Sequence, residues 1–199
     1  MEASSGNSGI SLAAIGRALG HRVRIFLPEQ PTRLLRDLIT GYGAEVQMVT
    51  AEQGGLQGAI RMAEAIGHFD GVFLPRQLAN QYNSEAHEKT TGREIGFHLL
   101  LKQLRPAAFV AGAGTGGTLM GVGKYLRMLY PAVGIHPVQP QPNIHRIPGI
   151  SGSTLDQLPQ LAELDKPVSI SDGDAILMAQ ALFKDLGLAV GLSSGANLL

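Results

Sequence analysis

The fold is decided by the stretch Ala108-Phe109-Val110-Ala111-Gly112-Ala113-Gly114-Thr115-Gly116-Gly117-Thr118, an apolar run that breaks into four glycines before a predicted helix. Glycines let backbone N–H groups crowd around an oxyanion without obstruction by Cβ atoms, and a helix start points its unsatisfied donors and positive dipole end at the same place. Thr115 and Thr118 add hydroxyl donors. The stretch predicts an anion cradle, with phosphate as the obvious guest. A tight strand-to-helix connection without a ligand is the alternative.

The composition limits the partners of this 199-residue chain. Sixteen basic and sixteen acidic residues cancel, so no net charge steers the protein to nucleic acid or to an anionic membrane. Cysteine is absent, which excludes disulfides, thiolate metal sites and cysteine nucleophiles. No apolar run approaches the roughly twenty residues of a membrane span. We expect a soluble, cytoplasmic protein with a small-molecule partner and no metal.

Helical and strand patterns alternate along the chain, which argues for an α/β fold with a parallel sheet covered by helices. The predicted helices cover 10–19, 32–39, 56–66, 84–101, 118–128 and 175–186. Thr32 is the expected N-cap of the second helix. The predicted strands cover 23–27, 46–49, 72–74, 107–111, 133–138 and 188–192.

Three glycine-rich turns follow strand positions, where ligands bind in such sheets. They are Ser4-Ser5-Gly6-Asn7-Ser8-Gly9, the cradle, and Gly191-Leu192-Ser193-Ser194-Gly195. All three are expected to face the same side. Met1 directly precedes the first turn, so its leading strand is expected to be missing, and a new helix is expected near Gly195. The chain therefore resembles a middle portion of something longer.

The spacing of Gly112, Gly114 and Gly117 also satisfies the dinucleotide pattern G-x-G-x-x-G. Such sites need an acidic residue about twenty positions further on, but no Asp or Glu occurs from Ile95 to Leu155. No Lys-Ser or Lys-Thr pair follows the glycines either, which excludes a P-loop. A smaller phosphorylated ligand remains.

Four motifs in this order resemble pyridoxal-phosphate enzymes of the cysteine synthase group, within the tryptophan synthase beta-like family. They are Glu2–Ile10, Gln77 with His87–Ile95, Gly114–Thr118 and Gly191–Gly195. Further stretches resemble the B-type O-acetylserine sulfhydrylase: Leu27-Pro28, Thr50–Gly54, and Gln139-Pro140 followed by Ile147–Ile150.

The resemblance implies roles for individual residues. The cofactor phosphate would be bound by Gly114, Thr115, Gly116, Gly117 and Thr118. Asn7 would bond the phenolic oxygen of the ring, and Ser193 would face the ring nitrogen. The carboxylate of an amino-acid substrate would be bound by Ser4, Ser5, Ser8 and Gln77. Simpler interpretations stay open: the serines and Asn7 could cap helices, Gln77 could be a surface side chain, and His87 could pair with nearby helix residues.

The chain also departs from the family. There a lysine upstream of the first glycine turn forms the covalent link to the cofactor and moves the proton. None of the lysines here lies in a matching motif: Lys89, Lys102, Lys124, Lys166 and Lys184. We therefore predict no catalytic residue in this chain, noncovalent cofactor binding and little turnover. Ser151 and Gly152 stand where the B type carries an arginine pair, which leaves the sulfur donor open.

The sequence interpretation is a doubly wound α/β protein of two lobes. Residues 1–80 would form a smaller, mobile lobe for the substrate carboxylate, and residues 81–199 a larger lobe for the cofactor phosphate. The implied reaction converts O-acetyl-L-serine and sulfide to L-cysteine and acetate in a homodimer. A dehydratase, a cystathionine β-synthase-like enzyme and a noncatalytic binding or dimerising chain are the alternatives.

Overall fold

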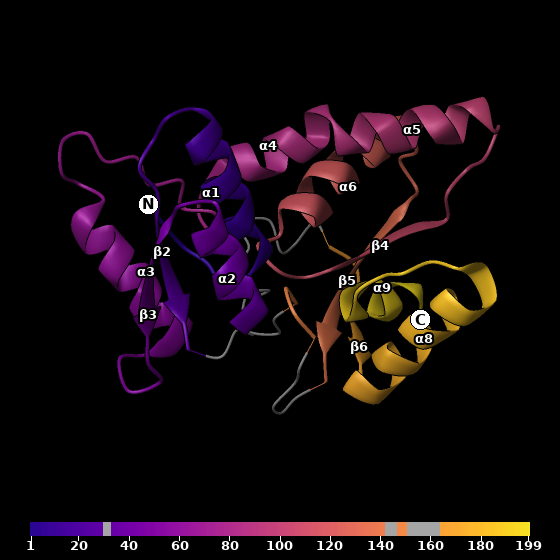
Figure 1. Cartoon of the computed structure of the whole chain (residues 1–199). Helices are drawn as coiled ribbons and strands as arrows, with labels where there is room; N and C mark the ends of the chain where they lie inside the picture. Colours follow the sequence, from indigo (N-terminus) through magenta and orange to yellow (C-terminus); the bar gives the residue numbers. More distant parts are fainter. Residues whose placement is uncertain (30–32, 142–146, 151–163) are drawn as a thin grey trace. The chain divides into compact units, whose positions relative to one another are not determined.

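The computed structural model describes residues 1–29, 33–141, 147–150 and 164–199. The chain divides into two compact units, Met1–Ala79 and Asn80–Leu199 (Figure 1). Each unit has its own three-stranded parallel sheet and its own apolar clusters, so each is described by itself. No helix within the described ranges is long and apolar enough to cross a bilayer.

The N-terminal unit is built on the sheet β1-β2-β3, with strands Glu2–Ala3, Arg24–Pro28 and Glu45–Val49. The helices are α1 (Asn7–Ala18), α2 (Arg33–Gly41) and α3 (Gly55–Ile66). Phe26 packs in one cluster with Ala59 and Ala63 of α3, while Ile25 and Leu27 pack in the other with residues of α1 and α2. The central strand is apolar throughout its middle because helices cover both faces of the sheet.

The C-terminal unit is built on the sheet β4-β5-β6, with strands Ala108–Gly112, Gly134–Pro140 and Val168–Ile170. Its helices are α4 (Gln81–Lys89), α5 (Thr91–Leu101), α6 (Gly117–Leu129), α8 (Asp172–Leu186) and α9 (Leu192–Leu198). Helices α4 and α5 pack against α6, and α9 packs against α8 and β4 (Figure 1). The cradle lies in this unit, between the end of β4 and the start of α6.

The predicted α/β class with parallel sheets is confirmed, but several elements differ from the prediction. A strand does precede the first glycine turn: β1 pairs with β2 through Glu2 and Ala3. The helix expected over 84–101 is two helices that meet at Thr90, whose φ of −120° and ψ of −81° interrupt the helical path. Residues 72–74 and 188–192 form no strand in the described part of the chain. Strand β6 was not predicted, and the expected cap Thr32 lies outside the described residues.

Glycines set the distance between α6 and its neighbours. A Cβ placed on Gly121 would lie 2.1 Å from the carbonyl oxygen of Ser84 in α4, and one on Gly96 in α5 would lie 2.7 Å from Cε1 of Tyr125. The overlap at Gly121 meets a backbone carbonyl and cannot be relieved without moving that backbone, whereas the overlap at Gly96 requires the Tyr125 ring to shift. The three helices are therefore packed at a separation that only glycine permits.

We expect Gly121→Ala to lower the free energy of unfolding by about 2 kcal/mol or more, because the added methyl overlaps a backbone carbonyl. Gly173→Ala, in helix α8, is the matched control. Its Cβ would meet only the Ser171 hydroxyl at 3.8 Å, so it is expected to raise stability by about 0.5 kcal/mol through helix propensity. Urea denaturation followed by circular dichroism measures both. Equal effects of the two substitutions would contradict the packing argument.

Candidate functional site

The cradle presents backbone donors that no group in the described residues satisfies. Gly116 is the N-cap of α6 and has a left-handed φ of 81°, and no side chain caps the helix. Within the described residues, the N–H groups of Thr115, Gly116, Gly117 and Thr118 have no hydrogen-bond acceptor. Gly116 and Gly117 are buried. Buried N–H groups are almost always paired, so this turn is built to receive an acceptor, and the helix dipole favours an anionic one.

Two further cradle glycines are required by close neighbours. A Cβ on Gly114 would lie 2.3 Å from the carbonyl oxygen of Gly149, in the segment Ile147–Ile150. A Cβ on Gly117 would lie 2.1 Å from Oδ1 of Asn83. The turn is also held from the sheet, since the Ala113 N–H donates to the Val138 carbonyl at 2.8 Å. The cradle is thus a rigid backbone shape fixed by contacts around it.

The two threonine hydroxyls of the cradle are oriented by side chains of α4. Asn83 Nδ2 donates to Thr115 Oγ1 at 2.9 Å, which leaves the hydroxyl proton of Thr115 available to an anion. His87 Nε2 lies 3.3 Å from Thr118 Oγ1, while its Nδ1 lies 3.0 Å from Thr91 Oγ1. The expectation that His87 pairs with helix residues is confirmed. Sequence reasoning missed Asn83, because no local pattern relates a residue in one helix to a turn 32 positions away.

Ser193 lies in the first turn of α9, a helix that contacts β4. The backbone carbonyl of Gly191 accepts from the N–H groups of Ser194 and Gly195, and no side chain caps this helix. The interpretation of Ser193 and Ser194 as capping side chains is therefore wrong. The Ser193 side chain is half-buried and has no hydrogen-bond partner in the part of the chain that the structure describes. Its hydroxyl is available to a ligand.

In the N-terminal unit, Ser4 does act as a helix cap. Its buried Oγ accepts from the N–H groups of Gly6 at 3.2 Å and Gly9 at 3.0 Å. Ser5, Asn7 and Ser8 are exposed at the start of α1 and have no hydrogen-bond partner within the described ranges. The turn therefore separates into one structural serine and three side chains that face solvent. Direct contact of Ser4 with a substrate stays a prediction.

Gln77 contacts β1, the strand directly before the Ser4–Gly9 turn. Its Nε2 donates to the carbonyl oxygen of Ala3 at 2.7 Å, and its backbone N–H donates to Oε2 of Glu2 at 3.1 Å. The side chain is half-buried. The interpretation of Gln77 as an unattached surface side chain is wrong, because it is hydrogen-bonded to both residues of β1, the strand that ends directly before Ser4. Sequence reasoning missed Glu2, which is a buried carboxylate at the first position of β1.

The environment of Glu2 changes its titration. Burial raises the pKa of the Glu2 carboxyl above its ordinary value, against the opposing effect of hydrogen bonds from the backbone N–H groups of Ala3 and Gln77. No cluster of three His, Asp or Glu side chains suited to a metal ion occurs among the residues that the structure describes.

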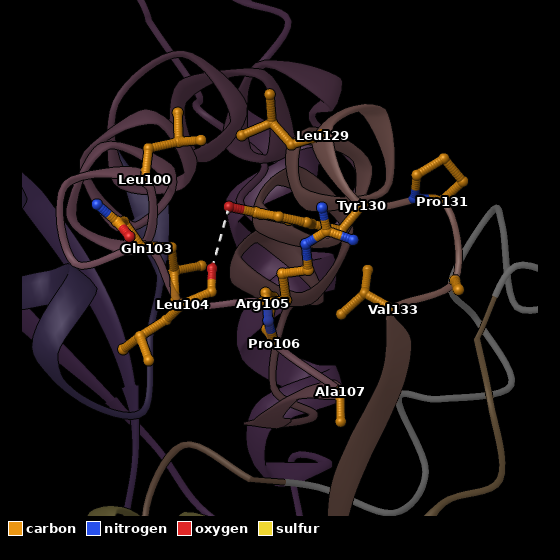
Figure 2. A pocket seen from close by; sticks show the side chains of 12 residues that line it. Leu100, Gln103, Leu104, Arg105, Pro106, Ala107, Leu129, Tyr130, Pro131 and Val133 are labelled. Carbon is orange, nitrogen blue, oxygen red and sulfur yellow. Dashed lines mark hydrogen bonds between the residues drawn. The ribbon is translucent and has the colours of Figure 1, made fainter.

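A groove of about 820 Å³ lies at the opposite end of β4 from the cradle. Figure 2 shows its lining, in which Tyr130 Oη donates to the Leu104 carbonyl at 3.3 Å. Its residues come from the ends of α5 and α6 and the segments that follow them. Because the groove precedes the strand and the cradle follows it, the groove takes no part in the candidate site.

Residues 1–199 match the family described as pyridoxal-phosphate dependent enzyme. The chain belongs to this family. It is 34% identical over 208 residues to a cysteine synthase of Staphylococcus aureus, covering 98% of this chain and 65% of that protein. It is 36% identical to cysteine synthase B of Campylobacter jejuni, covering 99% of this chain and 68% of that protein. The chain thus spans about two thirds of the length of these relatives.

Solved structures agree with the family. A hydrogen sulfide-producing enzyme from Fusobacterium nucleatum is similar with a TM-score of 0.93 and 41% identity, covering 99% of this chain and 62% of that chain. A cysteine synthase from Entamoeba histolytica is similar with a TM-score of 0.85 and 29% identity, covering 99% and 60%. The resemblance to cysteine synthases seen in the sequence motifs is therefore confirmed.

The residues present fit the cofactor that names the family. The phosphate of pyridoxal phosphate is a dianion near neutral pH, and the cradle offers four unpartnered N–H groups with two oriented hydroxyls. The half-buried Ser193 hydroxyl in the same unit suits a neutral ring nitrogen. The fit rests on donors that the described part of the chain leaves unsatisfied.

We expect Thr115→Val to weaken binding of pyridoxal phosphate about tenfold, because it removes one hydrogen bond to a charged group while keeping the volume. Asn83→Ala should have a similar effect because it releases the Thr115 hydroxyl from its orientation. Fluorescence titration with the cofactor and calorimetry with inorganic phosphate measure the change. Thr40→Val, at an exposed helix position, is the control. Unchanged affinity in both cradle variants would rule out the phosphate assignment.

Glu2 should make stability depend on pH. Since its pKa is raised on folding, the native state binds more protons than the unfolded state just above the ordinary glutamate pKa, and stability falls as pH rises through the raised value. Glu2→Gln should flatten this part of the curve. Urea unfolding between about pH 4 and pH 8 tests it. The burial argument would be contradicted if the wild-type free energy of unfolding rose with pH in this range and Glu2→Gln abolished that rise.

Proposed function

We propose that this chain binds pyridoxal phosphate and acts in cysteine biosynthesis, in an enzyme that converts O-acetyl-L-serine and sulfide to L-cysteine and acetate. The observation that carries the proposal is the set of unpartnered N–H donors at the start of α6. The family match and the cysteine synthases among the relatives support it. We further propose a cytoplasmic homodimer, as the family resemblance implies.

When bound, the cofactor supplies an electron sink that makes loss and replacement of a β-substituent possible. In this proposal, Gly114 to Thr118 hold the phosphate, and Asn7 donates to the phenolic oxygen of the ring. Ser193 offers the ring nitrogen a neutral hydroxyl, which does not enforce protonation of that nitrogen as a carboxylate would. Such an arrangement favours β-replacement over reactions that need the strongest electron sink.

The substrate carboxylate would be bound by the polar side chains of the first turn, Ser5 and Ser8 with Ser4 behind them, and by Gln77. The start of α1 favours a negative charge because its first N–H groups have no acceptor within the helix. Ser4 already bonds two N–H groups of the turn. We propose that Ser4 fixes the shape of this turn and that the exposed serines make the contact.

No lysine in the described residues occupies a position suited to a covalent link, because each of the five is exposed to solvent: Lys89, Lys102, Lys124, Lys166 and Lys184. Lys89 pairs with Glu85 along α4, and Lys124 Nζ lies 2.7 Å from Glu88 Oε2. Both are exposed to solvent on helix surfaces. We therefore expect the 199-residue chain alone to bind the cofactor without a covalent bond and to show little turnover.

A second candidate function is release of hydrogen sulfide from cysteine. The hydrogen sulfide-producing enzyme from Fusobacterium nucleatum is 41% identical to this chain, against 34% for the Staphylococcus aureus cysteine synthase. Both activities use the same cofactor and differ in which group leaves and which group adds. The choice depends on the rate with each substrate.

Turnover by the complete gene product, loaded with pyridoxal phosphate, tests the proposal. We expect O-acetyl-L-serine and sulfide to give cysteine with a kcat/KM at least tenfold above that of sulfide release from cysteine. The reverse ratio would favour the second candidate, and no turnover of either amino acid would contradict both.

A second experiment tests the covalent link. After borohydride reduction, the 199-residue chain should carry no attached cofactor, and detection of a reduced adduct would contradict this expectation.

A further inference from the structure

Glu2 is a charged side chain placed where charge is costly. It lies at the start of β1, and only 3% of the residue is exposed. A buried carboxylate is tolerated only when hydrogen bonds replace its lost hydration. Here both oxygens are used: Oε1 accepts from the Ala3 N–H at 2.9 Å, and Oε2 accepts from the Gln77 N–H at 3.1 Å. The carboxylate therefore joins β1 to a segment 75 residues further along the chain.

The segment around Gln77 has little regular structure to hold it. Residues 72–77 adopt neither helix nor strand. Arg76 has a positive φ of 54°, a conformation that side chains other than glycine rarely adopt and that costs on the order of 1 kcal/mol. Such a conformation persists only when its surroundings impose it. Hydrogen bonds from the start of the chain supply part of those surroundings: Glu2 Oε2 accepts from the Gln77 N–H, the Ala3 carbonyl accepts from the Gln77 side chain, and the Met1 amino group donates to the Phe73 carbonyl at 2.8 Å.

The contacts connect two parts of the proposed substrate site. Ala3 leads directly into the turn that begins at Ser4, and Ser4 itself accepts from two N–H groups of that turn. Gln77 is the other predicted contact of the substrate carboxylate. A small cavity of about 50 Å³, lined in part by Glu2, Arg76 and Gln77, adjoins the linkage. Apart from Glu2, the acidic side chain that lines this cavity is Glu64, which is exposed.

We propose that Glu2 is a positioning residue that holds Gln77 in register with the Ser4 turn, so that both bind one substrate carboxylate. The proposal rests on the proposed function, since it assigns Glu2 to the amino-acid site of that enzyme. Glu2 does not touch the substrate. It acts through its hydrogen bonds to the backbone N–H groups of Gln77 and Ala3. Without these hydrogen bonds, the segment around Gln77 could relax from the unfavourable positive φ of Arg76.

The test compares Glu2→Ala, Glu2→Gln and the control Glu64→Gln in the complete gene product. We expect Glu2→Ala to raise the KM for the amino-acid substrate tenfold or more while kcat changes less than about threefold, because the carboxylate contacts are weakened equally in the ground state and in the transition state. Glu2→Gln should give an intermediate KM, since its amide oxygen keeps one of the two acceptor bonds. Hydrogen exchange should become faster at the Ala3 and Gln77 amides in both variants. Glu64→Gln should change none of these.

The outcomes separate the positioning role from a merely structural one. Faster exchange with an unchanged KM would overturn the proposal, and so would equal losses in kcat and in thermal stability without a change in KM. If Glu2→Ala does not fold, Glu2→Gln decides the matter by the same two measurements. A wild-type protein that turns over no amino acid would sink the proposed function, while the exchange measurement would still show whether Glu2 holds the Gln77 segment.

Discussion

The close approach of α6 to α4, and of the turn before α6 to the segment Ile147–Ile150, determines what the C-terminal unit can bind. Gly121 lets α6 meet the Ser84 carbonyl, Gly117 admits Asn83, and Gly114 admits the Gly149 carbonyl. With these contacts made, the first N–H groups of α6 have no acceptor among the described residues. These N–H groups are unsatisfied because the start of a helix has no intrahelical acceptor for them, and no side chain caps α6 among the described residues. An anion restores the missing hydrogen bonds, and the helix dipole sets the sign of the charge.

The same packing explains why a small phosphorylated cofactor suits the cradle. The hydroxyls of Thr115 and Thr118 are oriented from behind by Asn83 and His87, which leaves their other hydrogen-bonding positions for a ligand. Ser193 belongs to α9, which contacts β4 and whose Gly195 packs tightly on the Ala175 carbonyl in α8. The hydrogen-bond donors suited to a phosphate and the neutral Ser193 hydroxyl thus belong to the same unit.

In the N-terminal unit, two polar segments must be held together. Its polar segments near Ser4 and Gln77 are far apart in the sequence, and the Gln77 segment lacks helix and strand. A buried carboxylate joins them, at the cost of desolvating a charge. Such an arrangement contributes little net stability, because the hydrogen bonds mainly replace lost hydration. Its value lies in geometry, since it fixes one segment relative to another.

The sequence by itself determined the features that depend on neighbouring residues. The alternation of apolar runs predicted the parallel α/β class, the glycines from Gly112 to Gly117 predicted the cradle, and the ordered motifs identified the family. These features could be predicted because backbone freedom and periodicity depend on residues that are close together in the sequence.

Tertiary structure alone decided the rest. The two-residue strand β1 exists only through its pairing with β2, and the helix break at Thr90 lies where α4 and α5 both pack on α6. Asn83 at the cradle and Glu2 at Gln77 act across 32 and 75 positions. Contacts over such separations are set by how the elements pack, and no local pattern records them.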